Sequence, residues 1–261
     1  MSATSGPDIV SDGLVLCIDP RNGLSYPGSG TSITDLINNI NYTVGGVPSF
    51  NSGGYLESNI DENATGIYVG TDQLNISISH QSWMDTVFGT TTGAWSILEW
   101  IRIDEIPYPE APAGSVVSST AYGSSATGFD WNHGNGMGMY NLRMGASNSS
   151  VPDGGTSYDV QNNISIDTEF RTFGKWMCRQ MYWDRGDDTF GVYMNGVYQG
   201  NIDASTLSGY SIYDGSGIVF GSLYGWTHDG ARGPIFIFNR KLSQSEYNRH
   251  YDSLKTRFGL T

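Results

Sequence analysis

The side chains that could carry out acid–base chemistry in this sequence are few and poorly spaced for it. Glu99, Asp104 and Glu105 are the nearest group of acids in a segment with strand character. Retaining hydrolysis of a glycosidic bond needs two carboxylates about 5 Å apart, and successive side chains of a strand alternate between its faces. Glu99 and Asp104 are five positions apart, so they face opposite sides. We therefore expect no catalytic pair here.

Metal and nucleophile motifs are also missing from the sequence. The four histidines are isolated, and G-x-S-x-G, H-E-x-x-H and C-x-x-C do not occur. Cys17 and Cys178 lie in separate apolar runs, which favours two buried free thiols and leaves their proximity open. We expect no catalytic residue, no metal and no cofactor.

One carboxylate is placed where a charge is costly. Glu99 alternates with apolar residues along its segment, and Arg179 does the same in a later one. A buried charge destabilises a fold unless it is paired. The pattern therefore predicts a structural Glu99–Arg179 pair, or else a partly buried face that carries both groups at its rim.

An aromatic segment between the last two expected strands is the best candidate for binding. It contains Tyr224, Trp226, His228 and Asp229. Aromatic rings can stack on a sugar face while neighbouring polar groups bind its hydroxyls. The same residues would suit a subunit interface or plain internal packing, so all three interpretations stay open.

Composition narrows the class of protein. The 261 residues carry a formal net charge of −13, which disfavours nucleic acid as a partner. No run of 18 apolar residues is present, so we expect no membrane span. The segment from Met1 to Pro7 lacks the features of a signal peptide, which predicts synthesis and folding in the cytoplasm. The 35 glycines suit a fold with many tight turns.

The elements that would position these residues are mostly strands. Short alternating runs separated by turn residues predict an all-β sandwich, jelly roll or barrel. Residues 176–199 are expected to form a three-stranded meander, closed by a type I′ turn at Asn195-Gly196. Residues 110–128 and 145–165 are rich in small polar residues and suggest long surface loops.

The two ends of the chain differ from the middle. Ser243 and Glu246 form a capping box that predicts a helix over residues 243–258, ended by Gly259. Residues 13–261 are interpreted as one domain. Residues 1–12 contain few apolar side chains, and we expect them to become ordered against a neighbouring subunit.

Three segments, taken in order, resemble one family. They are Trp95–Arg102, Lys175–Val197, and Ile218–Gly221 with Pro234–Ser243. The sequence is similar there to concanavalin A-like, LamG-type lectin/glucanase domains. The resemblance implies a jelly-roll sandwich of two antiparallel sheets with a short C-terminal helix. Calcium-binding members carry an acidic residue before the last strand, and the stretch Gly230–Ile235 lacks it, so a calcium site is not expected here.

The end segments resemble a narrower group. Asp12–Pro20 and Tyr251–Leu260 are similar to LamG-like structural proteins of tailed-phage virions. This resemblance implies a non-enzymatic protein of the virion surface, located in a capsid decoration, a tail fibre or another appendage. Such a protein would contact capsid or tail subunits and further copies of itself. The alternative is a lectin-like module that recognises cell-surface polysaccharide in a receptor-binding fibre. A β-glucan hydrolase is the distant third.

Overall fold

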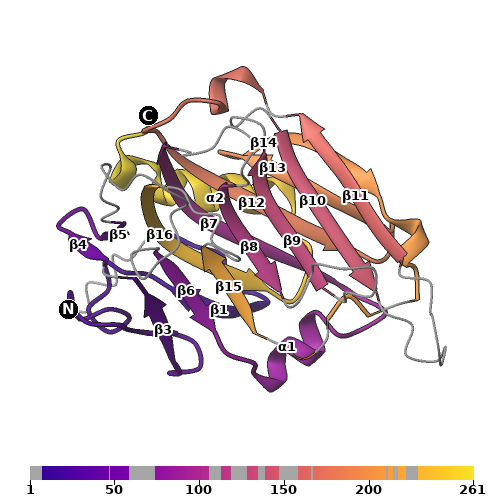
Figure 1. The fold of residues 1–261 in the computed structure, drawn as a ribbon, viewed down its shortest axis with the longest axis horizontal. Helices are drawn as coiled ribbons and strands as arrows, with labels where there is room; N and C mark the ends of the chain where they lie inside the picture. The colour runs from indigo at the N-terminus through magenta and orange to yellow at the C-terminus, as the bar shows by residue number, and fades with distance from the viewer. Residues whose placement is uncertain are drawn as a thin grey trace, which may run out of the picture.

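The protein is a sandwich of two antiparallel sheets with a helix packed outside one of them (Figure 1). The computed structural model describes residues 8–46, 48–58, 74–105, 113–118, 128–134, 139–146, 158–165, 167–209, 211–213, 215, 217–221 and 229–261. This architecture confirms the all-β jelly-roll sandwich with a C-terminal helix that was predicted from the sequence.

Each sheet has eight strands within the described residues. Sheet A contains, in spatial order, β14 (Val197–Asp203), β13 (Thr189–Met194), β12 (Trp176–Asp184), β7 (Ala94–Glu105), β16 (Asp229–Phe238), β5 (Tyr55–Glu57) and β4 (Ser49–Asn51), with β1 (Leu14–Ile18) also paired to β16. Sheet B contains β11 (Tyr158–Ser165), β10 (Met139–Ala146), β9 (Gly128–Gly134), β8 (Ala113–Ser118), β15 (Ile218–Gly221), β6 (Asn75–Ile78), β3 (Asn41–Gly45) and β2 (Ser32–Thr34).

Sheet A has a hydrophobic core on each of its two faces, as the residues of strand β7 show. Trp95 and Ile97 point into the main core between the sheets, whereas Leu98 and Trp100 join a second core on the outer face of sheet A. A strand that is apolar on both faces must be covered on both. Sheet B covers the inner face, and the C-terminal helix covers the outer one (Figure 1).

The C-terminal helix α2 (Gln244–Leu254) begins as the sequence predicted. The Ser243 side chain accepts a hydrogen bond from the Glu246 amide, and Glu246 reaches back to the Ser243 amide. The last turn of the predicted helix is a 3-10 helix, η3 (Lys255–Phe258), and Gly259 ends it with a φ of 72°. The residue before the cap is fixed to sheet A, because the Leu242 amide donates to the hydroxyl of buried Ser96 on β7.

The predicted meander is present, and its turn has the expected geometry. Asn195 and Gly196 have φ values of 49° and 81°, as a type I′ turn requires. Other elements differ from the prediction. Strand β11 lies inside the segment expected to be a loop at 145–165, and the short helix α1 (Ser82–Val87) was not predicted. The remaining short 3-10 helices are η1 (Thr168–Phe170) and η2 (Ser205–Leu207).

The N-terminal segment packs against its own chain. Asp8 forms an ion pair with Arg249 of α2, and Val10 is buried in the outer core. The sequence suggested that residues 1–12 become ordered against a neighbouring subunit. For residues 8–12, the structure already provides contacts within the chain.

Candidate functional site

The interior of the sandwich contains a cluster of three ionic side chains, which we call the buried ion cluster: Glu99, Arg179 and Arg232. They come from the adjacent strands β7, β12 and β16. Arg179 Nε donates to Glu99 Oε1 at 2.5 Å, and Arg232 Nη1 donates to Glu99 Oε2 at 2.6 Å. All three side chains are 0% exposed. The structure thus brings Glu99 and Arg179 together in the interior, rather than at the rim of a partly buried face.

Arg232 is the member of this cluster that the sequence did not reveal. Ile235, not Arg232, is the register partner of Glu99 on β16, and the register shifts between Arg232 and Ile235. Because of that irregularity Arg232 shares the inner face with Ile235, three positions on, whereas strict alternation would place residues three apart on opposite faces. A Cβ on Gly233 would lie 2.8 Å from the Phe258 ring, so glycine is required at the irregularity. Period-2 counting fails at such a bulge.

The buried ion cluster is closed to solvent, which excludes acid–base chemistry on a substrate. Both oxygens of Glu99 are bound to guanidinium groups, and no part of the side chain reaches solvent. A general acid or a nucleophile must reach a substrate atom, which Glu99 cannot do. Burial lowers the pKa of Arg232 to about 10, with Arg179 adding to the shift and Glu99 opposing it.

A second cluster is partly exposed on the outer face of sheet A, and we call it the Arg102 cluster: Arg102, Glu57, Asp104, Tyr55 and Trp176. Arg102 donates to Glu57 at 2.9 Å and to Asp104 at 2.8 Å. Its guanidinium carbon lies 5.7 Å from the ring centroids of both Tyr55 and Trp176. The two acids raise the pKa of Arg102 above its ordinary value. The Trp176 ring is buried and packs on Tyr55 and Phe258. The cluster therefore offers a polar ligand the partly exposed Tyr55 ring, the Arg102 head and the two carboxylates.

This cluster adjoins the end of the aromatic segment that the sequence favoured for binding. Tyr224, Trp226 and His228 lie outside the described residues. Asp229 is the first residue of β16, where its backbone pairs with Glu105, and its side chain is likewise outside the description. The next residue but one, Ala231, pairs with both Glu57 and Arg102. The C-terminal end of the segment therefore joins the strand beside the Arg102 cluster.

The place where the segment rejoins the sheet is held firmly. The Ser58 hydroxyl accepts from the Gly230 amide at 3.0 Å, and the Ser58 amide donates to the Gly230 carbonyl at 2.9 Å. A Cβ on Gly230 would lie 2.0 Å from the Arg102 carbonyl oxygen, so only glycine fits between these strands. The start of β16 at Gly230 is therefore a fixed point of the sheet.

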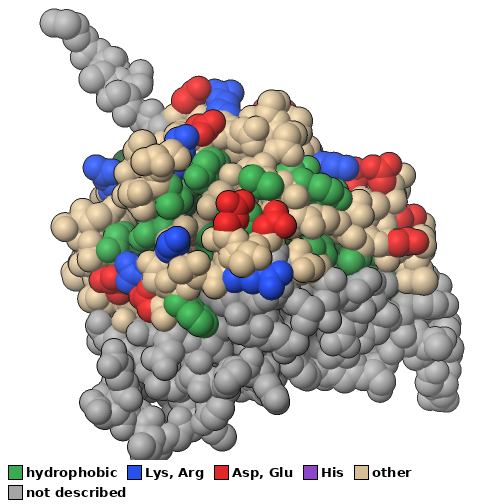
Figure 2. Space-filling view, turned by 90° about the horizontal axis from the view of Figure 1, so that it is seen from above, with side chains coloured by type: hydrophobic (Ala, Val, Ile, Leu, Met, Phe, Trp, Pro, Cys, Tyr) green, Lys and Arg blue, Asp and Glu red, His purple; other side chains and the backbone are tan. Residues whose placement is uncertain are grey.

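Exposed apolar side chains lie near the Arg102 cluster and on an edge strand. Phe173 is 44% exposed, and its neighbour Gly174 is bonded through its amide to the Ile103 carbonyl. Val197 and Tyr198 of edge strand β14 are each 45% exposed. Figure 2 shows apolar side chains on the surface between groups of acidic and basic ones.

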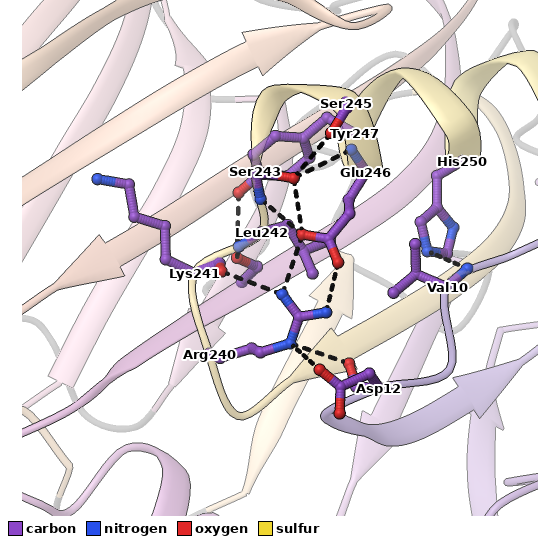
Figure 3. A network of polar contacts seen from close by, with 11 residues as sticks. Val10, Asp12, Arg240, Lys241, Leu242, Ser243, Ser245, Glu246, Tyr247 and His250 are labelled. Carbon is purple, nitrogen blue, oxygen red and sulfur yellow. Dashed lines mark hydrogen bonds and ion pairs between the residues drawn. The ribbon is translucent and has the colours of Figure 1, made fainter.

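A third polar network fixes the outer helix (Figure 3). Arg240 contacts Asp12 at 2.9 Å and Glu246 at 2.6 Å, so one guanidinium joins the N-terminal segment to the start of α2. Arg240 holds the pKa of Glu246 down to about 2. Deeper in the network, the Val10 amide donates to His250 Nε2 at 3.2 Å.

The described residues contain no group of three or more histidine, cysteine, aspartate or glutamate side chains that could hold a metal ion. Cys17 and Cys178 are buried free thiols, and burial raises the pKa of Cys17 to about 12. No helix in the described parts of the chain is long and apolar enough to cross a membrane.

Comparison with known proteins identifies the fold. No family model and no curated protein matches the sequence. The structure is similar to the binding domain of botulinum neurotoxin DC in complex with rat synaptotagmin II, with a TM-score of 0.60, 14% identity, and coverage of 93% of this chain and 52% of that one. It is also similar to the same domain in complex with SialylT, with a TM-score of 0.60, 14% identity, and coverage of 93% and 52%.

A third similar structure is that of botulinum neurotoxin type C, which depends on interaction with two ganglioside molecules to enter cells. Its TM-score is 0.58 at 15% identity, covering 93% of this chain and 51% of that one. The chain therefore spans about half the length of these neighbours. At these identities the likeness shows a shared β-sandwich fold.

Proposed function

We propose that this protein is a non-enzymatic component of a tailed-phage virion surface that acts through protein–protein contacts, as a capsid decoration or as part of a fibre or other appendage. The sandwich is a rigid platform. Its loops, its edge strand β14 and its N-terminal segment make the contacts with capsid or tail subunits and with further copies of the chain.

One observation carries this proposal. The two segments that resemble virion proteins, Asp12–Pro20 and Tyr251–Leu260, are distant in sequence but meet in space. Arg257 forms an ion pair with Asp19 at 2.8 Å, and the Arg240 contact joins Asp12 to the start of α2. The two matched segments therefore form part of one packed unit, which a neighbouring subunit would meet as a single surface.

The charge of the chain indicates how it binds. A net charge of −13 keeps exposed surfaces from clumping because like charges repel. An acidic subunit that docks on its own copies gains little from charge pairing, so the exposed apolar residues Val197, Tyr198 and Leu24 are the favoured contacts.

Washing of purified particles tests the proposal. In about 1 M salt, charge interactions are screened beyond about 3 Å. We expect the protein to stay in the particle fraction after this wash, as judged by immunoblotting. If it is absent from unwashed particles, the virion assignment is wrong. If salt releases the protein from the particles, the inference that apolar side chains make the contacts is wrong.

A glycan-binding function is the second candidate, and the Arg102 cluster favours it. The cluster places a cation, two carboxylates and the partly exposed Tyr55 ring beside the start of β16, which the aromatic segment Tyr224–Gly230 leads into along the chain. One neighbouring fold belongs to a toxin that interacts with gangliosides. A glycan array tests this with Trp226→Ala, and Tyr198→Ala on β14 is the matched control. Binding lost only in Trp226→Ala supports the lectin function, whereas no binding by the unchanged protein removes it.

A β-glucan hydrolase remains the distant alternative. Of the acids Glu99, Asp104 and Glu105, Glu99 is buried and bound to two arginines, so it cannot reach a substrate. This argues against a hydrolase. Release of reducing ends from β-glucans, measured over hours at high protein concentration, would restore this alternative.

A further inference from the structure

The buried ion cluster leaves part of one guanidinium without a partner. Glu99 has two oxygens, and each is taken by one arginine. On Arg232 the Nε and Nη2 atoms are buried and make no hydrogen bond. A guanidinium has five N–H donors, and buried donors of a charged group are costly to leave unsatisfied. The interior therefore presents unused donors of a cation at a defined place.

We propose that the space between the sheets holds a small monovalent anion, of the halide class, bound to Arg232. The three described side chains carry two positive charges and one negative charge, and a single monovalent anion balances them. This inference is independent of the proposed function, since it concerns the interior of the sandwich and not its surface.

The electrostatics favour an anion over a water molecule. Burying an uncompensated charge costs several kcal/mol, and water can satisfy donors but cannot cancel a charge. The low dielectric of the interior strengthens the attraction between a guanidinium and an anion. The depressed pKa of Arg232 shows the same penalty, since burial and the charge of Arg179 both act against its cationic form.

The surroundings determine which anion fits. The inner faces of the three strands are otherwise apolar, with Ile101, Met177, Met181 and Ile235 in the same core. An anion must lose its water to enter such a place, and the guanidinium is itself a weakly hydrated cation. Weakly hydrated halides are therefore favoured, in the order bromide, chloride, fluoride.

Anion-dependent stability tests the proposal on the whole chain. The protein is unfolded in urea, refolded in sodium gluconate, fluoride, chloride or bromide at constant ionic strength, and melted. We expect bromide and chloride to raise the Tm in a saturable way, by about 5 to 10 °C at about one hundred times the dissociation constant. Equal Tm values in gluconate, fluoride, chloride and bromide would overturn the proposal.

A variant separates the buried site from anions bound elsewhere. Arg232→Met removes the excess cation and leaves Glu99 paired with Arg179, so its Tm should no longer depend on chloride or bromide. Arg171→Met, at an exposed arginine, is the control and should keep the dependence. A halide effect that persists in Arg232→Met would show that the anion is not bound at Arg232.

Crystallography covers the case in which Arg232→Met does not fold. Crystals of the unchanged protein grown in bromide should give an anomalous peak between the sheets, within hydrogen-bond reach of Arg232 Nε or Nη2. Bromide peaks confined to the surface would overturn the proposal, whatever the variant does.

Discussion

Acidification is expected to destabilise this protein through one buried imidazole, that of His250 on α2. Only 1% of this residue is exposed. Its Nε2 accepts from the Val10 amide, so the neutral ring carries its proton on Nδ1. The rings of Phe236 and Phe238 pack against it at 5.0 and 5.3 Å. Protonation would place a charge among apolar groups and would remove the acceptor that holds the N-terminal segment.

The size of the effect follows from the pKa of His250. Burial lowers this pKa from 6.5 to about 4, Arg249 adds to the shift, and Glu246 opposes it. Between these two pH values the unfolded chain binds a proton that the folded chain does not, so stability falls as the pH falls. The stability that the protein gains by keeping His250 neutral is fully present above about pH 6.5 and is lost by about pH 4. At ~1.4 kcal/mol per unit of pKa, it amounts to about 3 kcal/mol.

Urea denaturation at several pH values from 7.5 to 4 measures this contribution. The comparison uses His250→Gln, which keeps a neutral polar side chain, and His80→Gln, at a partly exposed histidine, as the control. The unchanged protein and His80→Gln should lose about 3 kcal/mol more than His250→Gln between pH 6.5 and 4. Carboxylates that titrate in the same range affect all three proteins and cancel in the difference. Parallel curves for all three would refute the reasoning.

Three further predictions concern the fold. Glu99→Gln leaves two buried guanidinium groups without their carboxylate and should lower the free energy of unfolding by about 3–5 kcal/mol. The control, Glu169→Gln at an exposed position, should change it by less than about 0.5 kcal/mol. Equal urea midpoints for the two variants would contradict this. Ser243→Ala removes the capping box of α2 and should cost about 1 kcal/mol, with Ser245→Ala as the comparison. Gly196→Ala should cost more than about 1 kcal/mol, because its φ is 81° and a Cβ would lie 2.7 Å from the Asn248 side chain; a variant as stable as the parent would show that the turn can relax.

The sequence predicts well where local signals are strong. The turn at Asn195-Gly196 and the capping box at Ser243 depend on backbone preferences of a few residues, and both are present. The proximity of Glu99 and Arg179 was suggested because both interrupt apolar alternation, and a buried charge is costly unless it is paired. The turn and the capping box need no knowledge of the distant parts of the chain, whereas the Glu99–Arg179 pair joins residues 80 positions apart.

Other features depend on tertiary context and were missed for that reason. Arg232 reaches the inner face through an irregularity in β16, which simple alternation cannot reveal. Strand β11 is largely polar, so it resembles a loop until its pairing with β10 is known. The contact between Val10 and His250 joins residues that are 240 positions apart. No local sequence pattern predicts it.

Electron cryo-microscopy of intact particles tests the central proposal most directly. We predict density on the outside of the capsid or on a tail appendage into which the sandwich fits, with β14 or the N-terminal segment at the contact with a neighbouring subunit. Particles that contain the protein in their interior, or that lack density for it altogether, would contradict the assignment of this chain to the virion surface.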